Sequence, residues 1–281
     1  MFDHTILTGF ADEIAASLDT QMQVLDKLQM NHIEMRGVDG RNFVEYTKEE
    51  AQDIRRRLDD RGFALSAVGS PIGKIGITDD FAPHMELFRH TVELAHLMGT
   101  PNIRMFSFYV PREKAESYRG KVLEQLGQFA DYAAANEVVL LHENEKGIYG
   151  EMAESCLELM KNFAGPHFKA VFDFANFVQA GQDTLEAYEL LKPYIAYIHV
   201  KDALFQDGSV VPAGHGDGNV KEILGRLKAG GYSGYLSLEP HLSEFTGFSS
   251  LEKGGQIGRK LSGEEAFTLA HDALVKILEE L

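Results

Sequence analysis

The feature that most constrains this chain is a pattern repeated along its length: an amphipathic helical stretch, a polar or glycine-containing break, and a short apolar run. Eight of these runs are rich in β-branched and aromatic residues, and most are apolar on both alternating faces. Such runs predict strands that are buried on both sides of a sheet. The expected strands are Ile6–Phe10, His32–Met35, Ala64–Val68, Asn102–Phe108, Val138–His142, Ala170–Phe172, Ile195–Val200 and Tyr235–Leu238.

Between these runs, apolar residues recur about every 3.6 positions, which indicates helices. The expected helices are Ser17–Leu28, Lys48–Asp60, Phe81–Met98, Arg112–Ala135, Glu151–Phe163, Asp183–Leu191, Val220–Ala229 and Gly263–Leu281. Strict alternation of strand and helix implies a parallel sheet with right-handed crossovers. Eight such units without a break in composition predict one domain, residues 1–281, folded as a closed (β/α)8 TIM barrel in preference to an open doubly wound sheet.

Composition narrows the classes of function. Lys and Arg number 27 against 43 Asp and Glu, and the resulting net charge of −16 opposes binding to a nucleic-acid backbone. The single cysteine, Cys156, excludes a disulfide scaffold and a cysteine-cluster zinc site. No apolar run approaches the ~18 residues of a membrane span, and no signal peptide is visible. We therefore expect a soluble cytoplasmic protein without nucleic-acid or membrane partners.

Four expected strands end in polar residues that strand propensity does not explain. Glu143, Asp173, His199 and Glu239 occupy equivalent places in four consecutive strand–helix units. In a barrel these four ends would lie side by side at the carboxyl mouth, where barrel enzymes build their active sites. Any one of these residues alone would be better explained as a helix cap, an ion-pair partner or a core histidine. Together they predict a binding site.

The predicted site has an electrostatic cost that a metal ion would remove. At ~3–4 Å and an effective dielectric of ~20, each pair of carboxylates repels by roughly 4–5 kcal/mol. Protonation could relieve this repulsion, but a divalent cation would relieve it more fully and would also use the imidazole nitrogen. Carboxylate oxygens with one nitrogen suit Mn²⁺, Mg²⁺, Co²⁺ or Zn²⁺. We therefore expect one divalent metal ion.

The strand-end motifs resemble those of a known family. They are His142-Glu143-Asn144, Phe172-Asp173-Phe174-Ala175-Asn176, Ile198-His199-Val200-Lys201-Asp202 and Leu238-Glu239-Pro240. Their order and spacing are similar to those of the xylose-isomerase-like TIM-barrel superfamily, in particular its sugar phosphate isomerases and epimerases. The resemblance implies a metal held by Glu143, Asp173, His199 and Glu239. It also implies that Glu143 and Glu239 act as acid and base on opposite faces of a bound carbohydrate.

The implied reaction is an isomerisation or epimerisation of a small sugar, sugar phosphate or sugar acid, by proton transfer through a metal-stabilised enediolate. Two alternatives stay open. One is a lyase similar to inosose dehydratase, which would expel a hydroxyl from the same intermediate. The other is a barrel that binds a sugar without turning it over. The endonuclease IV branch of the superfamily is disfavoured, because its additional metal ligands are not found and the chain is strongly acidic.

Five further residues are candidates for contact with the substrate: Lys201, Asn176, His241, His215 and Arg104. Each has a structural alternative; for example, Lys201 could form a salt bridge to a carboxylate, and Arg104 could pair with Glu34 across the barrel. Asn176 stands where ketose 3-epimerases usually have His, and His215 stands where relatives often carry Glu. The apolar run 245–248 could be a lid, a contact in a homo-oligomer or ordinary loop packing.

Overall fold

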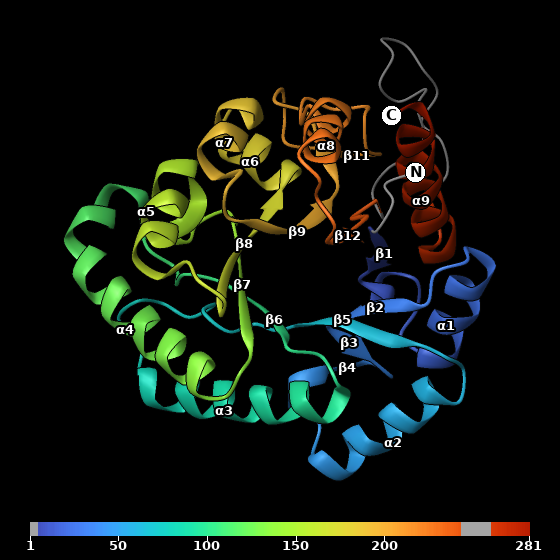
Figure 1. Cartoon of the computed structure of the whole chain (residues 1–281), viewed down its shortest axis with the longest axis horizontal. Coiled ribbons are helices and arrows are strands. Elements are labelled where there is room, and N and C mark those ends of the chain that lie inside the picture. Colours follow the sequence, from blue (N-terminus) through green and yellow to red (C-terminus); the bar gives the residue numbers. More distant parts are fainter. Residues whose placement is uncertain (1–4, 243–259) are drawn as a thin grey trace.

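The computed structural model describes residues 5–242 and 260–281, and its centre is an eight-stranded parallel sheet curled into a barrel (Figure 1). Strands pair in the order β1-β12-β9-β8-β7-β6-β5-β2, and the end strands β1 and β2 lie beside each other, so the barrel is nearly closed. The strands are β1 (Ile6–Gly9), β2 (His32–Met35), β5 (Ala64–Gly69), β6 (Asn102–Met105), β7 (Val139–Glu143), β8 (Phe168–Asp173), β9 (Ile195–Val200) and β12 (Tyr235–Leu238). The expected (β/α)8 barrel is confirmed, whereas the run 245–248 lies outside the described residues.

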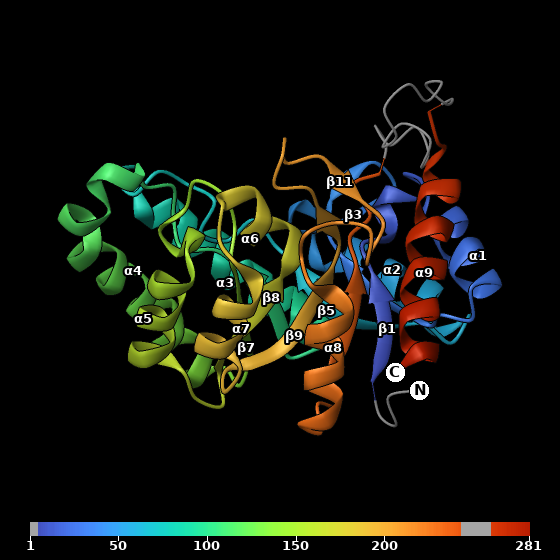
Figure 2. The same ribbon diagram turned by 90° about the horizontal axis from the view of Figure 1, so that it is seen from above.

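Helices surround the barrel, and the last of them, α9, packs over β1 and β12 (Figure 2). The helices are α1 (Leu18–Lys27), α2 (Lys48–Asp59), α3 (Phe81–Met98), α4 (Ala115–Ala135), α5 (Ala153–Phe163), α6 (Phe174–Ala180), α7 (Thr184–Leu191), α8 (Val220–Ala229) and α9 (Gly263–Glu280). Eight of them match the expected helices to within a few residues. Within the described ranges, no helix has the length and apolarity that crossing a membrane requires.

The short helix α6 was not predicted from the sequence. It begins directly after Asp173, whose carboxylate caps it by accepting the N–H of Asn176 at 2.8 Å. Five of its seven residues are buried, so the segment has no polar face to produce a helical period. The helix fixes the backbone at the end of β8 and places Asn176 at the mouth of the barrel.

The fourth strand of the barrel, β6, is shorter than expected. It was predicted to continue to Phe108 but ends at Met105. Beyond that point the chain leaves the sheet and bonds to the loop after β5, with the N–H of Phe106 donating to Ile72 O at 2.8 Å and that of Phe108 to Gly73 O at 2.9 Å. The apolar sequence continues because this loop pairing is itself buried.

The long segment after β9 is built around one buried carboxylate. Strands β10 (Asp202–Ala203) and β11 (Val210–Val211) form an antiparallel hairpin within it. Asp202 is fully buried and accepts backbone hydrogen bonds from Gly214 at 3.0 Å, Gly216 at 3.0 Å and Gly218 at 2.8 Å. A Cβ at Gly216 would lie 2.4 Å from the Asp202 carboxylate, so the alternating glycines allow the loop to wrap closely around it.

Replacing this carboxylate should destabilise the fold. Asp202→Ala leaves four backbone N–H groups, those of the three glycines and Ala203, without their charged acceptor, and we expect the free energy of unfolding to fall by about 3 kcal/mol. Urea unfolding followed by circular dichroism measures the change. Asp207→Ala is the control, because Asp207 is exposed and accepts only local hydrogen bonds from Ser209 among the described contacts. Equal stability of the two variants would contradict the anchoring role.

Candidate metal centre

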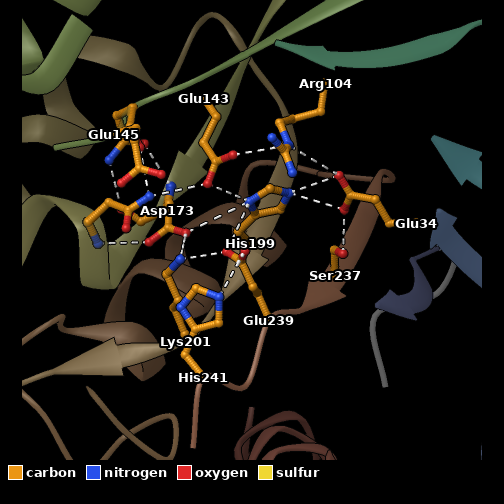
Figure 3. A network of polar contacts seen from close by, with 12 residues as sticks. Glu34, Arg104, Glu143, Glu145, Asp173, His199, Lys201, Ser237, Glu239 and His241 are labelled. Atoms are coloured by element: carbon orange, nitrogen blue, oxygen red, sulfur yellow. Dashed lines mark hydrogen bonds and ion pairs between the residues drawn. The ribbon is translucent and has the colours of Figure 1, made fainter. Parts of the chain in front are cut away.

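Four side chains from neighbouring strands meet at the carboxyl end of the barrel (Figure 3). They are Glu143 at the end of β7, Asp173 at the end of β8, His199 near the end of β9 and Glu239 directly after β12. All four are buried, and one donor atom from each lies within 4.8 Å of the others. We call this group the carboxylate–histidine cluster. Its four members were expected from the sequence to lie side by side at the mouth of the barrel.

The alternation of side chains along a strand explains this convergence. Leu141, Val171 and Tyr197 pack together, and they precede three of the cluster residues by two positions. Side chains two positions apart on a strand point to the same face. The cluster therefore continues an inward-facing row of side chains toward the mouth, where polar groups replace apolar ones.

His199 lies at the centre of the cluster and has carboxylates on both of its ring nitrogens. Nδ1 is 2.9 Å from Glu143 Oε1 and 3.8 Å from both Asp173 Oδ2 and Glu239 Oε2. Nε2 is 3.1 Å from Glu34 Oε2. Burial alone would lower the pKa of His199, but Glu143 and Glu34 raise that pKa well above its ordinary value. The raised pKa of His199 therefore reflects the negative charges that surround the imidazole.

Lys201 brings an ammonium group into the same cluster. It lies two positions after His199, and its Nζ is 2.5 Å from Glu239 Oε2 and 3.1 Å from Asp173 Oδ2. Burial would raise the pKa of Glu239, but Lys201 and His241 hold that pKa well below its ordinary value. Burial raises the pKa of Asp173, and the opposing effect of the Lys201 ammonium, which lowers that pKa, is smaller. The salt-bridge alternative for Lys201 is therefore observed in the structure.

The charges and donor atoms of this site fit a divalent cation. Four buried carboxylates, those of the cluster together with Glu34, face two permanent cations, Arg104 and Lys201. These groups carry a net charge of −2 when His199 is neutral, as a metal-binding imidazole is. Arg36 at the rim also contacts Glu239, but it is paired with Asp12, which lies outside this count. In addition, Asp173 Oδ2 is buried and has the ion pair with Lys201 but no hydrogen bond of good geometry. Three carboxylates and one imidazole could hold a divalent ion here, and that ion would balance the remaining charge.

Asn176 and Asn144 hold two of the carboxylates in place. The Asn176 side chain donates to Glu143 Oε1 at 3.2 Å and to the Asn144 carbonyl at 2.8 Å. Asn144 makes two hydrogen bonds with the backbone of Asp173, at 2.9 and 3.0 Å. The structure thus places Asn176 beside the cluster, and its contact with a substrate stays a prediction. The role of Asn144 was not predicted, although its place directly after a strand-end glutamate is a sequence signal that could have indicated it.

Arg104 points inward, but the carboxylate closer to it is Glu143 and not the expected Glu34. Its Nε lies 3.3 Å from Glu143 Oε2 and 4.0 Å from Glu34 Oε1, and its Nη1 donates to Ser70 O at 2.9 Å. The predicted Glu34 pair is therefore the longer of its two ion pairs. The guanidinium orients Glu143 from the side opposite Asn176.

The rim of the cluster includes a residue that was not predicted from the sequence. Arg36, directly after β2, donates to Glu239 Oε1 at 3.1 Å and binds Asp12 through two hydrogen bonds of 2.8 and 3.1 Å. His241, half exposed, has its Nε2 3.3 Å from both Glu239 and Glu13. Both Glu239 oxygens therefore face cationic or ionisable side chains, Lys201 on one oxygen and Arg36 with His241 on the other.

His215 takes a different place from the other predicted contact residues. It is exposed in the loop that wraps Asp202 and does not belong to the carboxylate–histidine cluster. Its sequence neighbours Gly214 and Gly216 donate to Asp202. Lys201, Asn176, Arg104 and His241 are brought to the cluster, whereas any contact between His215 and a substrate stays a prediction.

A family model described as a xylose isomerase-like TIM barrel matches residues 23–260. The chain belongs to this family. Among curated relatives, an uncharacterized protein of Methanocaldococcus jannaschii, MJ1311, is 24% identical over 169 residues, 55% of this chain and 56% of that protein. The 3-dehydroshikimate dehydratase of Bacillus anthracis is 21% identical over 171 residues, 60% of this chain and 61% of the enzyme. Both matches thus span well under two thirds of the relatives' length.

Solved structures of the same fold cover nearly the whole chain. The probable 3-DHS dehydratase AsbF of Bacillus anthracis has a TM-score of 0.74 at 17% identity, covering 96% of this chain and 99% of that one. The IolI protein with a bound zinc atom has a TM-score of 0.76 at 16% identity, covering 98% and 99%. D-psicose 3-epimerase has a TM-score of 0.68 at 18% identity, covering 97% and 98%. At these identities the likeness establishes the fold.

Removing the buried ammonium should destabilise the metal-depleted protein. Lys201→Met leaves Asp173 and Glu239 without their closest cation, and we expect the free energy of unfolding to fall by about 3 kcal/mol. Urea unfolding after dialysis against a chelator measures the change. The control is Lys192→Met, whose solvent-exposed ion pair with Glu189 should contribute little to stability. A Lys201 variant as stable as this control would contradict the balancing role of the ammonium.

Proposed function

We propose that this protein is a divalent-metal-dependent isomerase or epimerase of a small sugar, sugar phosphate or sugar acid. One observation carries the proposal: the carboxylate–histidine cluster, buried at the end of the barrel where such enzymes build their active sites. The proposed ligands of a single ion are Glu143, Asp173, His199 and Glu239. Mn²⁺, Mg²⁺, Co²⁺ and Zn²⁺ all suit this donor set. That D-psicose 3-epimerase shares the fold is consistent with this proposal.

When bound, a divalent ion would supply Lewis-acid polarisation of a substrate carbonyl and so acidify the adjacent C–H bond. The proton transfers are assigned to the glutamates. Glu143 and Glu239 enter from strands on either side of β8 and β9, and each is held by several donors. One carboxylate would remove the proton from one face of the substrate, and the other would return a proton to the opposite face.

The cationic side chains around the cluster would bind and orient the substrate oxygens. The Lys201 ammonium and the Arg104 guanidinium are buried beside the carboxylates, so they would act in a site with little water and correspondingly strong electrostatic interactions. Asn176 would keep Glu143 oriented, and His241 would meet the part of the substrate that extends toward solvent.

A dehydratase is the second candidate, and the position of Lys201 favours it. Its ammonium lies 2.5 Å from Glu239 and could hold a departing substrate hydroxyl by a hydrogen bond. Burial would lower the pKa of Lys201, but Asp173 and Glu239 raise that pKa well above its ordinary value, so the proton for the hydroxyl would come from the protonated base. The same proton abstraction could then be followed by protonation and loss of a substrate hydroxyl as water. The 21% identity to the 3-dehydroshikimate dehydratase of Bacillus anthracis is consistent with this route. The two candidate reactions share their first step and diverge at the second.

The metal site is tested by elemental analysis after the protein is reloaded with Mn²⁺. We expect about one ion per chain in the wild type and a clearly lower affinity in His199→Asn and Asp173→Asn, because each substitution removes one ligand. His96→Asn, at an exposed histidine, is the control and should bind as the wild type does. If the wild type retains no metal, the cluster is an ion-pair network and the proposal fails.

The reaction is tested by incubating the Mn²⁺-loaded protein in D₂O with ketoses, sugar phosphates, sugar acids and 3-dehydroshikimate. Deuterium incorporation next to the carbonyl with a new stereoisomer supports the epimerase, whereas loss of one water by mass supports the dehydratase. Glu143→Gln and Glu239→Gln should each abolish turnover, and Glu86→Gln, at an exposed ion pair, should not. Metal binding without any exchange would indicate a sugar-binding barrel.

A further inference from the structure

Glu34 is a buried carboxylate that the proposed ligand set does not use. It lies on β2, across the barrel from β9, with no exposed surface. Its Oε1 and Oε2 lie 3.2 and 3.1 Å from His199 Nε2, and the Ser237 hydroxyl donates to Oε2 at 2.6 Å. Figure 3 shows the resulting chain of contacts, which runs from Ser237 through Glu34 and His199 to the cluster.

The two sides of the His199 ring have different surroundings. Nε2 faces Glu34, whereas Nδ1 faces Glu143, Asp173 and Glu239. A neutral imidazole carries one N–H and one lone pair, and in this structure a carboxylate lies beside each nitrogen, Glu143 at Nδ1 and Glu34 at Nε2. An ion bound at Nδ1 would require the ring proton to be on Nε2, where Glu34 can accept it. An Nε2–H that donates to Glu34 leaves the Nδ1 lone pair directed into the cluster. Only this tautomer presents a lone pair where the carboxylates converge.

The other neighbours of Glu34 do not account for its burial. Arg104 is 4.0 Å away and lies closer to Glu143, at 3.3 Å, while one of its Nη atoms is bound to Ser70 O. A buried charge is costly unless it is paired and hydrogen-bonded. His199 and Ser237 meet this requirement within 3.2 Å, and the Tyr197 hydroxyl also hydrogen-bonds Glu34. Glu34 is thus bound to the ring more closely than to any permanent cation.

We infer that Glu34 is a positioning residue for the metal centre, which holds His199 in the tautomer and orientation that direct Nδ1 at the ion, and that Ser237 fixes Glu34 in turn. The inference rests on the proposed metal site and extends it to a carboxylate outside the ligand set. Partners of this kind on a metal-binding histidine typically change metal affinity 10–100-fold, roughly, when they are mutated.

The test measures metal affinity and the absorption spectrum of bound Co²⁺ in Glu34→Met and Glu34→Gln. We expect Glu34→Met to weaken Mn²⁺ and Co²⁺ binding by about 10–100-fold and to change the visible Co²⁺ spectrum. Glu34→Gln should lose less, because its amide oxygen can still accept the Nε2–H. Ser237→Ala should show a smaller loss of the same kind. Thr91→Val is the control, because this buried hydroxyl donates to Leu87 O within α3.

A double-mutant cycle separates positioning from general electrostatics. If Glu34 acts through the imidazole, Glu34→Gln should cause no further loss of metal affinity in a His199→Asn background. A fully additive loss would overturn the inference, since it would mean that the Glu34 charge acts on the ion directly. Wild-type affinity and spectra in both Glu34 variants would also overturn it. Failure of the wild type to bind metal would instead refute the metal site itself.

Discussion

The mouth of this barrel is organised by the burial of like charges in a small volume. Glu34, Glu143, Asp173 and Glu239 are all buried there. Two unit charges ~4 Å apart interact by ~4 kcal/mol at an effective dielectric of ~20. Unbalanced repulsion among four carboxylates would therefore exceed the ~5–15 kcal/mol that stabilises a typical domain. Every other polar feature of the site can be understood as a response to that repulsion.

The two halves of the barrel contribute different charges to the site. Strands β7, β8, β9 and β12 bear the carboxylate–histidine cluster, whereas the opposite half supplies cations that lie on aromatic rings. Arg104 lies 4.5 Å from the centre of the Phe106 ring and 5.2 Å from that of Phe10, and Arg36 lies 4.5 Å from that of Phe10. Such contacts partly replace the water that these cations lose on burial. Lys201 is the exception, because it reaches the carboxylates from β9 itself.

Sequence reasoning found the cluster because its members share one local signal. Each is a polar residue at the end of a buried strand, and the parallel barrel brings all strand ends together. Glu34 was expected to point inward and pair with Arg104, but its contact with His199, 165 residues away, was not predicted. Arg36 offers no comparable signal, and its partner Glu239 lies 203 residues away. The strand-like run through Phe106 and the mostly buried α6 were misread for a related reason. Both segments are buried against residues that are distant in the sequence. They therefore lack the regular alternation of polar and apolar residues from which helices and strands are predicted.

The same cluster is compatible with both proposed reactions because of its geometry. Removal of a proton next to a carbonyl needs a base and electrostatic stabilisation of the developing charge, and the buried groups provide both. The outcome then depends on whether a proton returns to carbon or to a departing hydroxyl. In the proposed function, that choice would belong to side chains around the cluster, such as Lys201, which contacts Glu239, and His241 at the rim. Reaction type in such a barrel is therefore decided by a few side chains around a site whose central charges need not change.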